Sequence, residues 1–180
     1  IIEDNSAAGD TWPYPAKGAL QFGNDTTVSH CVIAGNTASA HVGGTILGTV
    51  MTTFGLRDIL VEFTTIVGNR APGSYYALVD SNNDNVTFSH VIAYDNDGGQ
   101  MFGSGSGTTT IDYSLLHETG NAPAAVGAGT GNITGVAPGF VDYAGGDYSL
   151  IGGSPAIDAG DPSITETDGS PADLGATGGL

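Results

Sequence analysis

Two carboxylates, Glu62 and Asp112, are the best candidates in this sequence for a general acid and a general base. Each follows the first residue of a nine-residue segment that recurs along the chain, so both are expected on the outside of the fold. With two turns of about 4.8 Å between them, their separation would be roughly 10 Å, near the upper limit for the carboxylates of an inverting glycosidase. Exposed acids at a bend are the alternative interpretation.

Four ring side chains occupy the next position of the same segment. We expect them to form a ladder along the outside of successive turns. Such a stripe of flat rings could bind a ligand by stacking on sugar faces or on another chain, or it could simply cover the bend. The four residues are His30, Phe63, His90 and Tyr113.

One run of oxygen donors is similar to the start of a calcium loop. Asp80, Asn82 and Asp84 alternate with other polar residues, as the first ligands of a Ca²⁺ loop do. The run lacks the glycine at position six and the carboxylate at position twelve of an EF-hand, where Asn85 and Val91 stand. Ca²⁺ is therefore the cofactor to test, and ordinary polar turn residues are the alternative.

These candidates depend on a repeat that must position them. Segments 28–36, 61–69, 88–96 and 111–119 carry the same kinds of residue at the same offsets, and they begin 33, 27 and 23 residues apart. A constant pattern at a variable period is typical of a solenoid whose loops differ in length while its core does not. Offsets zero, three, five and eight are predicted to point inward, which requires a strand that bends and then continues.

The last inward column consists of asparagines, Asn36, Asn69 and Asn96. An inward amide can donate and accept hydrogen bonds along a stack and can satisfy backbone groups at a tight bend. Residues 1–5 align with 32–36, so the sequence begins within a repeat, as expected of a processed or truncated portion of a longer protein. A further strand is predicted to start at Ile133, 22 residues after Ile111.

The remaining strands of each turn give weaker signals. They are predicted before each segment, and the excess length of the second turn is predicted to be a protruding loop over 49–58. Stacked turns would place strands in parallel ladders about 4.8 Å apart. The predicted strands are 19–22, 45–50, 76–79 and 100–102.

Composition restricts the functional classes. Thirty glycines and eight prolines disfavour helix, and a length of 180 residues suits one domain. The formal net charge of −16, with only three Lys and Arg residues, would repel nucleic acid and anionic membranes. Cys31 is alone, which excludes an intrachain disulfide, and we expect it to be a small buried filler. No apolar run is long enough for membrane insertion.

The repeats resemble those of right-handed parallel β-helix proteins of the pectate-lyase-like fold. The end of the chain is similar to the C-terminal portion of many secreted bacterial surface proteins of that kind. The resemblance implies an all-β solenoid of about five turns over 1–136, with an irregular C-terminal cap section over 137–180, in an extracellular or cell-surface protein. The terminal motifs are NITGVAPGFVD (132–142), GDYSL (146–150), GSPAIDAGD (153–161) and DGSPADLGA (168–176).

The resemblance also suggests the polysaccharide lyases of the β-helix class. These enzymes abstract a proton with Lys or Arg beside a Ca²⁺-bound carboxylate. Arg57, next to Asp58, is the best candidate for that role, because Lys17 and Arg70 have no evident carboxylate cluster on their turns. The favoured function is a non-catalytic β-helix module with a structural, self-assembling or glycan-binding role, with self-association through the β-helix ends. The alternative is a polysaccharide-degrading enzyme, a lyase or glycoside hydrolase, or its C-terminal fragment.

Overall fold

The computed structural model of this chain is built from strands and turns, and its described residues contain no helix. High contents of glycine and β-branched residues account for this, because the former disfavours helices and the latter pack well on a pleated surface. The structure describes residues 1–4, 6–7, 20–22, 26–38, 51–54, 58–70, 79–82, 85–97, 102–104, 108–117 and 129–179.

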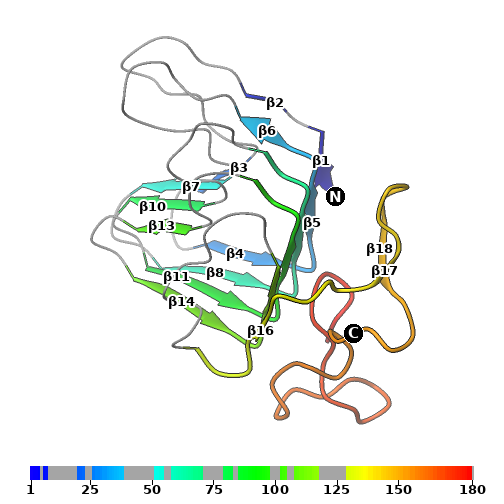
Figure 1. The fold of residues 1–180 in the computed structure, drawn as a ribbon. Coiled ribbons are helices and arrows are strands. Elements are labelled where there is room, and N and C mark those ends of the chain that lie inside the picture. The colour runs from blue at the N-terminus through cyan, green and yellow to red at the C-terminus, as the bar shows by residue number, and fades with distance from the viewer. Residues whose placement is uncertain are drawn as a thin grey trace, which may run out of the picture.

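Three parallel sheets form the body of the molecule (Figure 1). The six-stranded sheet runs in the order β1 (Ile2–Glu3), β5 (Val32–Ala34), β9 (Thr65–Val67), β12 (Ile92–Tyr94), β15 (Leu115–His117), β16 (Ile133–Thr134). The sheet that we call the β4–β14 sheet contains β4 (Thr26–Ser29), β8 (Asp58–Glu62), β11 (Asn85–Ser89) and β14 (Thr109–Asp112). The β3–β13 sheet contains β3 (Leu20–Phe22), β7 (Met51–Phe54), β10 (Val79–Asn82) and β13 (Phe102–Ser104).

Two small pairs complete the strands. A parallel pair joins β2 (Ser6–Ala7) to β6 (Thr37–Ala38), and an antiparallel hairpin joins β17 (Phe140–Asp142) to β18 (Asp147–Leu150). Along the chain, one strand from each of the three large sheets follows in turn, and this order repeats four times from β3 to β15. The repeat inferred from the sequence is therefore a repeat of strands.

The register of the strands confirms the alignment of the segments. Val28 pairs with Val61, Phe88 pairs with both Val61 and Ile111, and at the start of the chain Ile2 pairs with Ile33. Because side chains on a strand alternate with period two, a one-residue slip would turn every apolar side chain outward. The in-register pairing thus places equivalent residues of successive repeats over one another.

Each segment bends at the ring position, as the broken alternation predicts. His30, Phe63, His90 and Tyr113 have positive φ angles of 51°, 42°, 57° and 44°. This left-handed conformation is unusual for residues other than glycine and must be held by its surroundings. It turns the chain from the β4–β14 sheet into the six-stranded sheet and redirects the alternation of the side chains that follow.

The core lies between those two sheets. The columns predicted to point inward are buried, with Val61, Phe88 and Ile111 at 0% exposure. Their side chains form one apolar cluster with Ile33 and Ile66 from the six-stranded sheet. Cys31, expected to be buried, is only partly buried and packs against this cluster.

A buried asparagine ladder runs through the six-stranded side of the stack. Asn36, Asn69 and Asn96 are each 1% exposed. The Asn69 carboxamide oxygen accepts from the backbone N–H and the side-chain amide of Asn36, both at 3.0 Å, and the Asn96 oxygen accepts from Asn69 in the same way. The side-chain NH₂ of Asn69 also donates to the carbonyl of Ile33 at 3.0 Å. The predicted role of this column is confirmed.

Two details of the sequence prediction were wrong. Ile133 does begin a strand, but it pairs with Leu115 and not with the Ile111 column, because Asn132 occupies the position over Ser114. The Asn132 carboxamide accepts from the Ser114 N–H and donates to the Ile111 carbonyl, which satisfies these two backbone groups at the β14 end of the stack. The loop predicted over 49–58 contains a strand, β7, whose backbone is hydrogen-bonded to both β3 and β10.

The C-terminal section lies beside the six-stranded sheet, on the side away from the other two large sheets (Figure 1). Ile92 and Leu115 project outward from that sheet and form a second apolar cluster with Ala156 and Leu174. The section therefore packs laterally against the stack. Its connection to the stack is short, because β16 leads directly into it.

Replacing Asn69 by alanine tests the ladder. The substitution removes the acceptor of the buried Asn36 N–H, the side-chain donor to the Ile33 carbonyl and one of the two donors to Asn96, and we expect the free energy of unfolding to fall by about 3 kcal/mol. The matched control is Asn85→Ala, which removes an exposed asparagine and should cost about 0.5 kcal/mol or less. Urea unfolding followed by circular dichroism measures both. Equal effects of the two substitutions would contradict the structural role of the ladder.

Candidate glycan site and ring ladder

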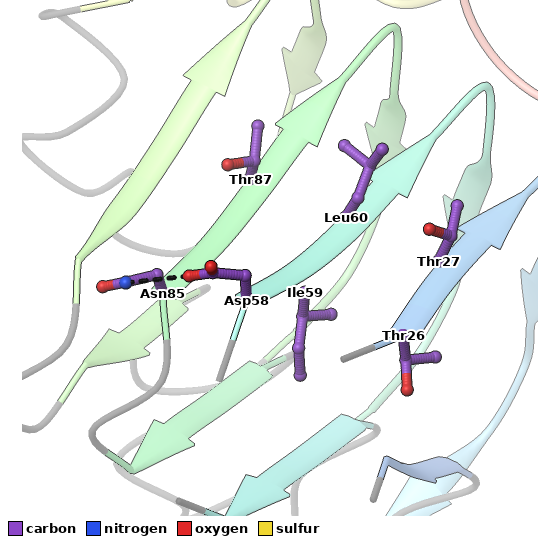
Figure 2. A pocket seen from close by; sticks show the side chains of 7 residues that line it. All are labelled: Thr26, Thr27, Asp58, Ile59, Leu60, Asn85 and Thr87. Carbon is purple, nitrogen blue, oxygen red and sulfur yellow. Dashed lines mark hydrogen bonds between the residues drawn. The ribbon is translucent and has the colours of Figure 1, made fainter. Parts of the chain in front are cut away.

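An open depression lies on the outer face of the β4–β14 sheet. It has a volume of about 300 Å³, at the lower end of the range for small-molecule sites. Thr27, Leu60 and Thr87 lie in register on neighbouring strands and project to the same side, whereas Thr26 and Ile59 project to the other side of the sheet (Figure 2). The resulting row presents one hydroxyl group on each side of the aliphatic side chain of Leu60.

A polar row borders this depression at the start of the strands. The Asn85 side-chain NH₂ donates to the Asp58 carboxylate at 3.0 Å (Figure 2). Its carboxamide oxygen accepts from the Thr108 hydroxyl at 2.8 Å. These groups are exposed and mutually oriented, so they present a fixed pattern of donors and acceptors beside the hydroxyl row.

The two predicted catalytic carboxylates lie on the same outer face but on separate strands. Glu62 and Asp112 each pair in register with Ser89, which stands between them. The Asp112 carboxylate accepts from the backbone N–H of Thr130 at 2.7 Å, so it helps to close the end of the sheet. This contact gives Asp112 a structural role. Arg57, the third catalytic candidate, lies outside the described residues.

The four predicted rings do form a ladder. Centroid distances are 5.1 Å from His30 to Phe63, 4.5 Å from Phe63 to His90 and 5.7 Å from His90 to Tyr113, with interplanar angles of 14° to 24°. Stacked rings at these distances stabilise one another beyond their buried area. The ladder supports the left-handed bends, because each ring is held by the ring of the neighbouring turn.

The C-terminal section covers the middle of this ladder. Phe63 is 8% exposed and His90 is 2% exposed. Gly160 and Gly179 lie directly on these rings, since an added Cβ would stand 2.6 Å from His90 Cδ2 and 2.9 Å from Phe63 Cε1. The His30 ring hydrogen-bonds the carbonyl of Gly178 at 3.1 Å. In this structure the ladder is a contact surface for the chain's own end.

The hydrogen bonds of His90 determine its tautomer. Its Nε2 accepts from the backbone N–H of Asp161 at 2.9 Å, so the proton of the neutral ring lies on Nδ1, 2.8 Å from the Ser89 hydroxyl. Burial lowers the pKa of His90 below its ordinary value, and the carboxylates of Asp161 and Glu62 only partly offset this effect. The neutral imidazole is thus the form that fits the site.

A second polar contact joins the C-terminal hairpin to the stack. Asp95 accepts from the Tyr143 hydroxyl at 2.7 Å and forms an ion pair with Arg70 at 3.0 Å. Burial opposes ionisation of Asp95, but the hydrogen bond from Tyr143 and the Arg70 guanidinium outweigh it, so the pKa of Asp95 is lowered. Arg70 is the only Lys or Arg among the described residues. Sequence reasoning missed this contact, because Tyr143 lies far along the chain and outside the repeat.

The described residues contain no cluster of three or more His, Cys, Asp or Glu side chains that could hold a metal ion. Asp80 and Asn82, two of the predicted Ca²⁺ ligands, belong to β10, and Asp84 lies outside the described part of the chain. In the C-terminal section, Asp161 and Asp168 instead form turns. Each carboxylate accepts from the backbone N–H and the hydroxyl of the serine two residues later, which lowers its pKa.

Glycine at position 160 is predicted to be essential for packing on the ladder. In Gly160→Ala the new methyl group would meet the Ala172 carbonyl and the His90 ring at 2.6 Å, which should lower the free energy of unfolding by about 1–3 kcal/mol. Gly152→Ala is the control, because a Cβ there meets nothing within 4 Å. Thermal unfolding of both variants checks this. A Gly160→Ala protein as stable as Gly152→Ala would argue against close packing here.

Comparison with models of known protein families, with curated proteins and with solved structures gives no match. A function for this chain is therefore inferred from its own geometry. Within the described residues, no helix is long and apolar enough to cross a membrane.

Proposed function

We propose that this chain is a right-handed parallel β-helix module of a secreted or cell-surface protein, and that it binds a glycan on the outer face of the β4–β14 sheet. The cyclic order of strands through three parallel sheets supports the β-helix assignment. The resemblance of the terminal motifs to secreted bacterial β-helix proteins supports the location.

The observation that carries the proposed function is the depression on the β4–β14 sheet. Sugars present hydroxyl groups at their edges and apolar C–H faces, so their sites combine hydrogen-bonding groups with an apolar surface. Thr27 and Thr87 supply hydroxyls on either side of Leu60, and the Asp58–Asn85 pair adds an acceptor and an amide beside them. Strand register fixes these groups relative to one another, which reduces the ordering cost of binding.

Charge restricts the kind of glycan. The acidic residues of this face are Asp58, Glu62 and Asp112, and the only described Lys or Arg, Arg70, is paired with Asp95. A polyuronate or sulfated polymer would meet like charge there, and the described residues of this face offer it no Lys or Arg partner. The face therefore suits a neutral glycan or one with amino groups.

Two other functions receive less support. End-to-end self-assembly needs matching ends, but the described strands number six in one sheet and four in each of the other two. Stacked copies would leave gaps in the two smaller sheets unless other segments filled them. Catalysis by Glu62 and Asp112 receives less support, because the Asp112 carboxylate is hydrogen-bonded to the Thr130 N–H and caps the end of its sheet.

Binding to a panel of neutral, amino and acidic polysaccharides tests the proposal. We expect saturable binding to a neutral or amino glycan by calorimetry, weakened about three- to tenfold in Thr87→Val, because one hydrogen bond contributes about 0.5–1.5 kcal/mol. Thr134→Val, the same change in an exposed residue of β16, should bind normally. Release of reducing ends or unsaturated products would instead indicate an enzyme. The absence of binding across the panel would refute the proposal.

A further inference from the structure

The contact between Asp161 and His90 has a feature that sets it apart from the other contacts of the C-terminal section. A backbone N–H of that section donates to an imidazole nitrogen of the ladder, at 2.9 Å. An imidazole nitrogen accepts only while it is unprotonated, and histidine is the side chain whose ordinary pKa lies near neutrality. We propose that this contact is a proton-operated clasp, which holds residues 161–163 on the ring ladder when His90 is neutral and releases them when it is protonated.

The surroundings of the His90 ring allow a second proton to bind at only one of its nitrogens. His90 Nδ1 already faces the Ser89 hydroxyl at 2.8 Å, so the added proton must go to Nε2 and point at the N–H of Asp161. Two donors facing each other cannot form a hydrogen bond, and the partly buried N–H of Asp161 then loses its acceptor. Rotation of the ring does not relieve this conflict, because His90 is stacked between Phe63 and Tyr113.

The charged groups around His90 favour movement of the loop over movement of the ring. The carboxylates that act on His90 are those of Glu62, on the β4–β14 sheet, and Asp161, on the C-terminal section. Tyr113 is the titratable ring stacked on it. The Asp161 carboxylate accepts from the N–H and hydroxyl of Ser163, so the turn 161–163 can move as a unit and bring its carboxylate toward the imidazolium.

The rest of the section has attachments that do not titrate with His90. The Gly175 N–H donates to the His90 backbone carbonyl at 2.9 Å, and the Ala176 N–H donates to the Thr65 hydroxyl at 3.0 Å. Leu174 is 0% exposed in the second apolar cluster. Gly160 also stays attached, because its N–H donates to the Ala172 carbonyl at 2.8 Å. Release is therefore local to the turn at 161–163, and it frees the Nε2 edge of the His90 ring.

The direction of the effect follows from the lowered pKa of His90. The closed clasp is complete above the ordinary histidine pKa of about 6.5 and is lost as the pH falls through the lower pKa of the closed form. Between those two pKa values, the ratio of open to closed clasp should increase about tenfold for each unit by which the pH falls.

Hydrogen exchange of the Asp161 amide, corrected for the intrinsic pH dependence of exchange, tests the clasp together with an NMR titration of the three described histidines, His30, His90 and His117. We expect protection of this amide to fall below pH 6.5 along with the titration of His90, while the Gly175 amide stays protected. Protection that is unchanged while His90 titrates, or that follows His30 or His117, would overturn the proposal.

Two substitutions separate the imidazole from the carboxylate. In His90→Gln the side-chain oxygen can still accept from Asp161 but does not titrate, so the loss of protection below pH 6.5 should disappear. In Asp161→Asn the N–H remains, so that loss should persist. If His90→Gln fails to fold, Asp161→Asn and the native titration still decide the question. A loss that persists in His90→Gln, or one that vanishes in Asp161→Asn, would show that the carboxylate and not the imidazole controls the turn.

Discussion

The in-register backbone ladder, with its buried asparagine column, is the constraint on which the rest of the structure depends. A parallel stack brings equivalent residues of successive repeats together, so an inward polar side chain contacts the equivalent side chains of the neighbouring turns. Asparagine is compatible with this arrangement because its amide both donates and accepts, and Asn69 does both toward its neighbours while binding the Ile33 carbonyl. The column joins turns of unequal length, because its hydrogen bonds do not depend on the loops between them.

The left-handed bend gives the molecule two different outer surfaces. Before the bend, the β4–β14 sheet presents hydroxyl, amide and carboxylate groups to solvent around the depression of Figure 2. After the bend, Ile92 and Leu115 project outward and would expose an apolar surface without the C-terminal section. That section covers them and the central rings, and its glycines permit the close approach. The terminal motifs are thus a lateral cover for one side of the stack.

Several acidic residues of this chain have structural roles, which explains part of its large negative net charge. Asp161 and Asp168 form turns with nearby serines, Asp112 caps a sheet end and Asp95 binds a tyrosine and an arginine. In each case a carboxylate oxygen is the acceptor. A net charge of −16 therefore reflects in part the use of carboxylates as hydrogen-bond acceptors, together with a scarcity of Lys and Arg.

The sequence by itself determined the repeat, the inward columns, the asparagine ladder and the stacking of the rings, because each depends on residue type at a fixed offset from a register that apolar burial enforces. It did not determine the pairing of Ile133, the strand β7, or the burial of Phe63 and His90. Those depend on where the non-repeating C-terminal section and the inserted residues come to lie. Only the tertiary structure decided that the ladder is covered while the β4–β14 face stays open, because contacts such as Asp161 with His90 and Tyr143 with Asp95 join residues that no periodicity relates.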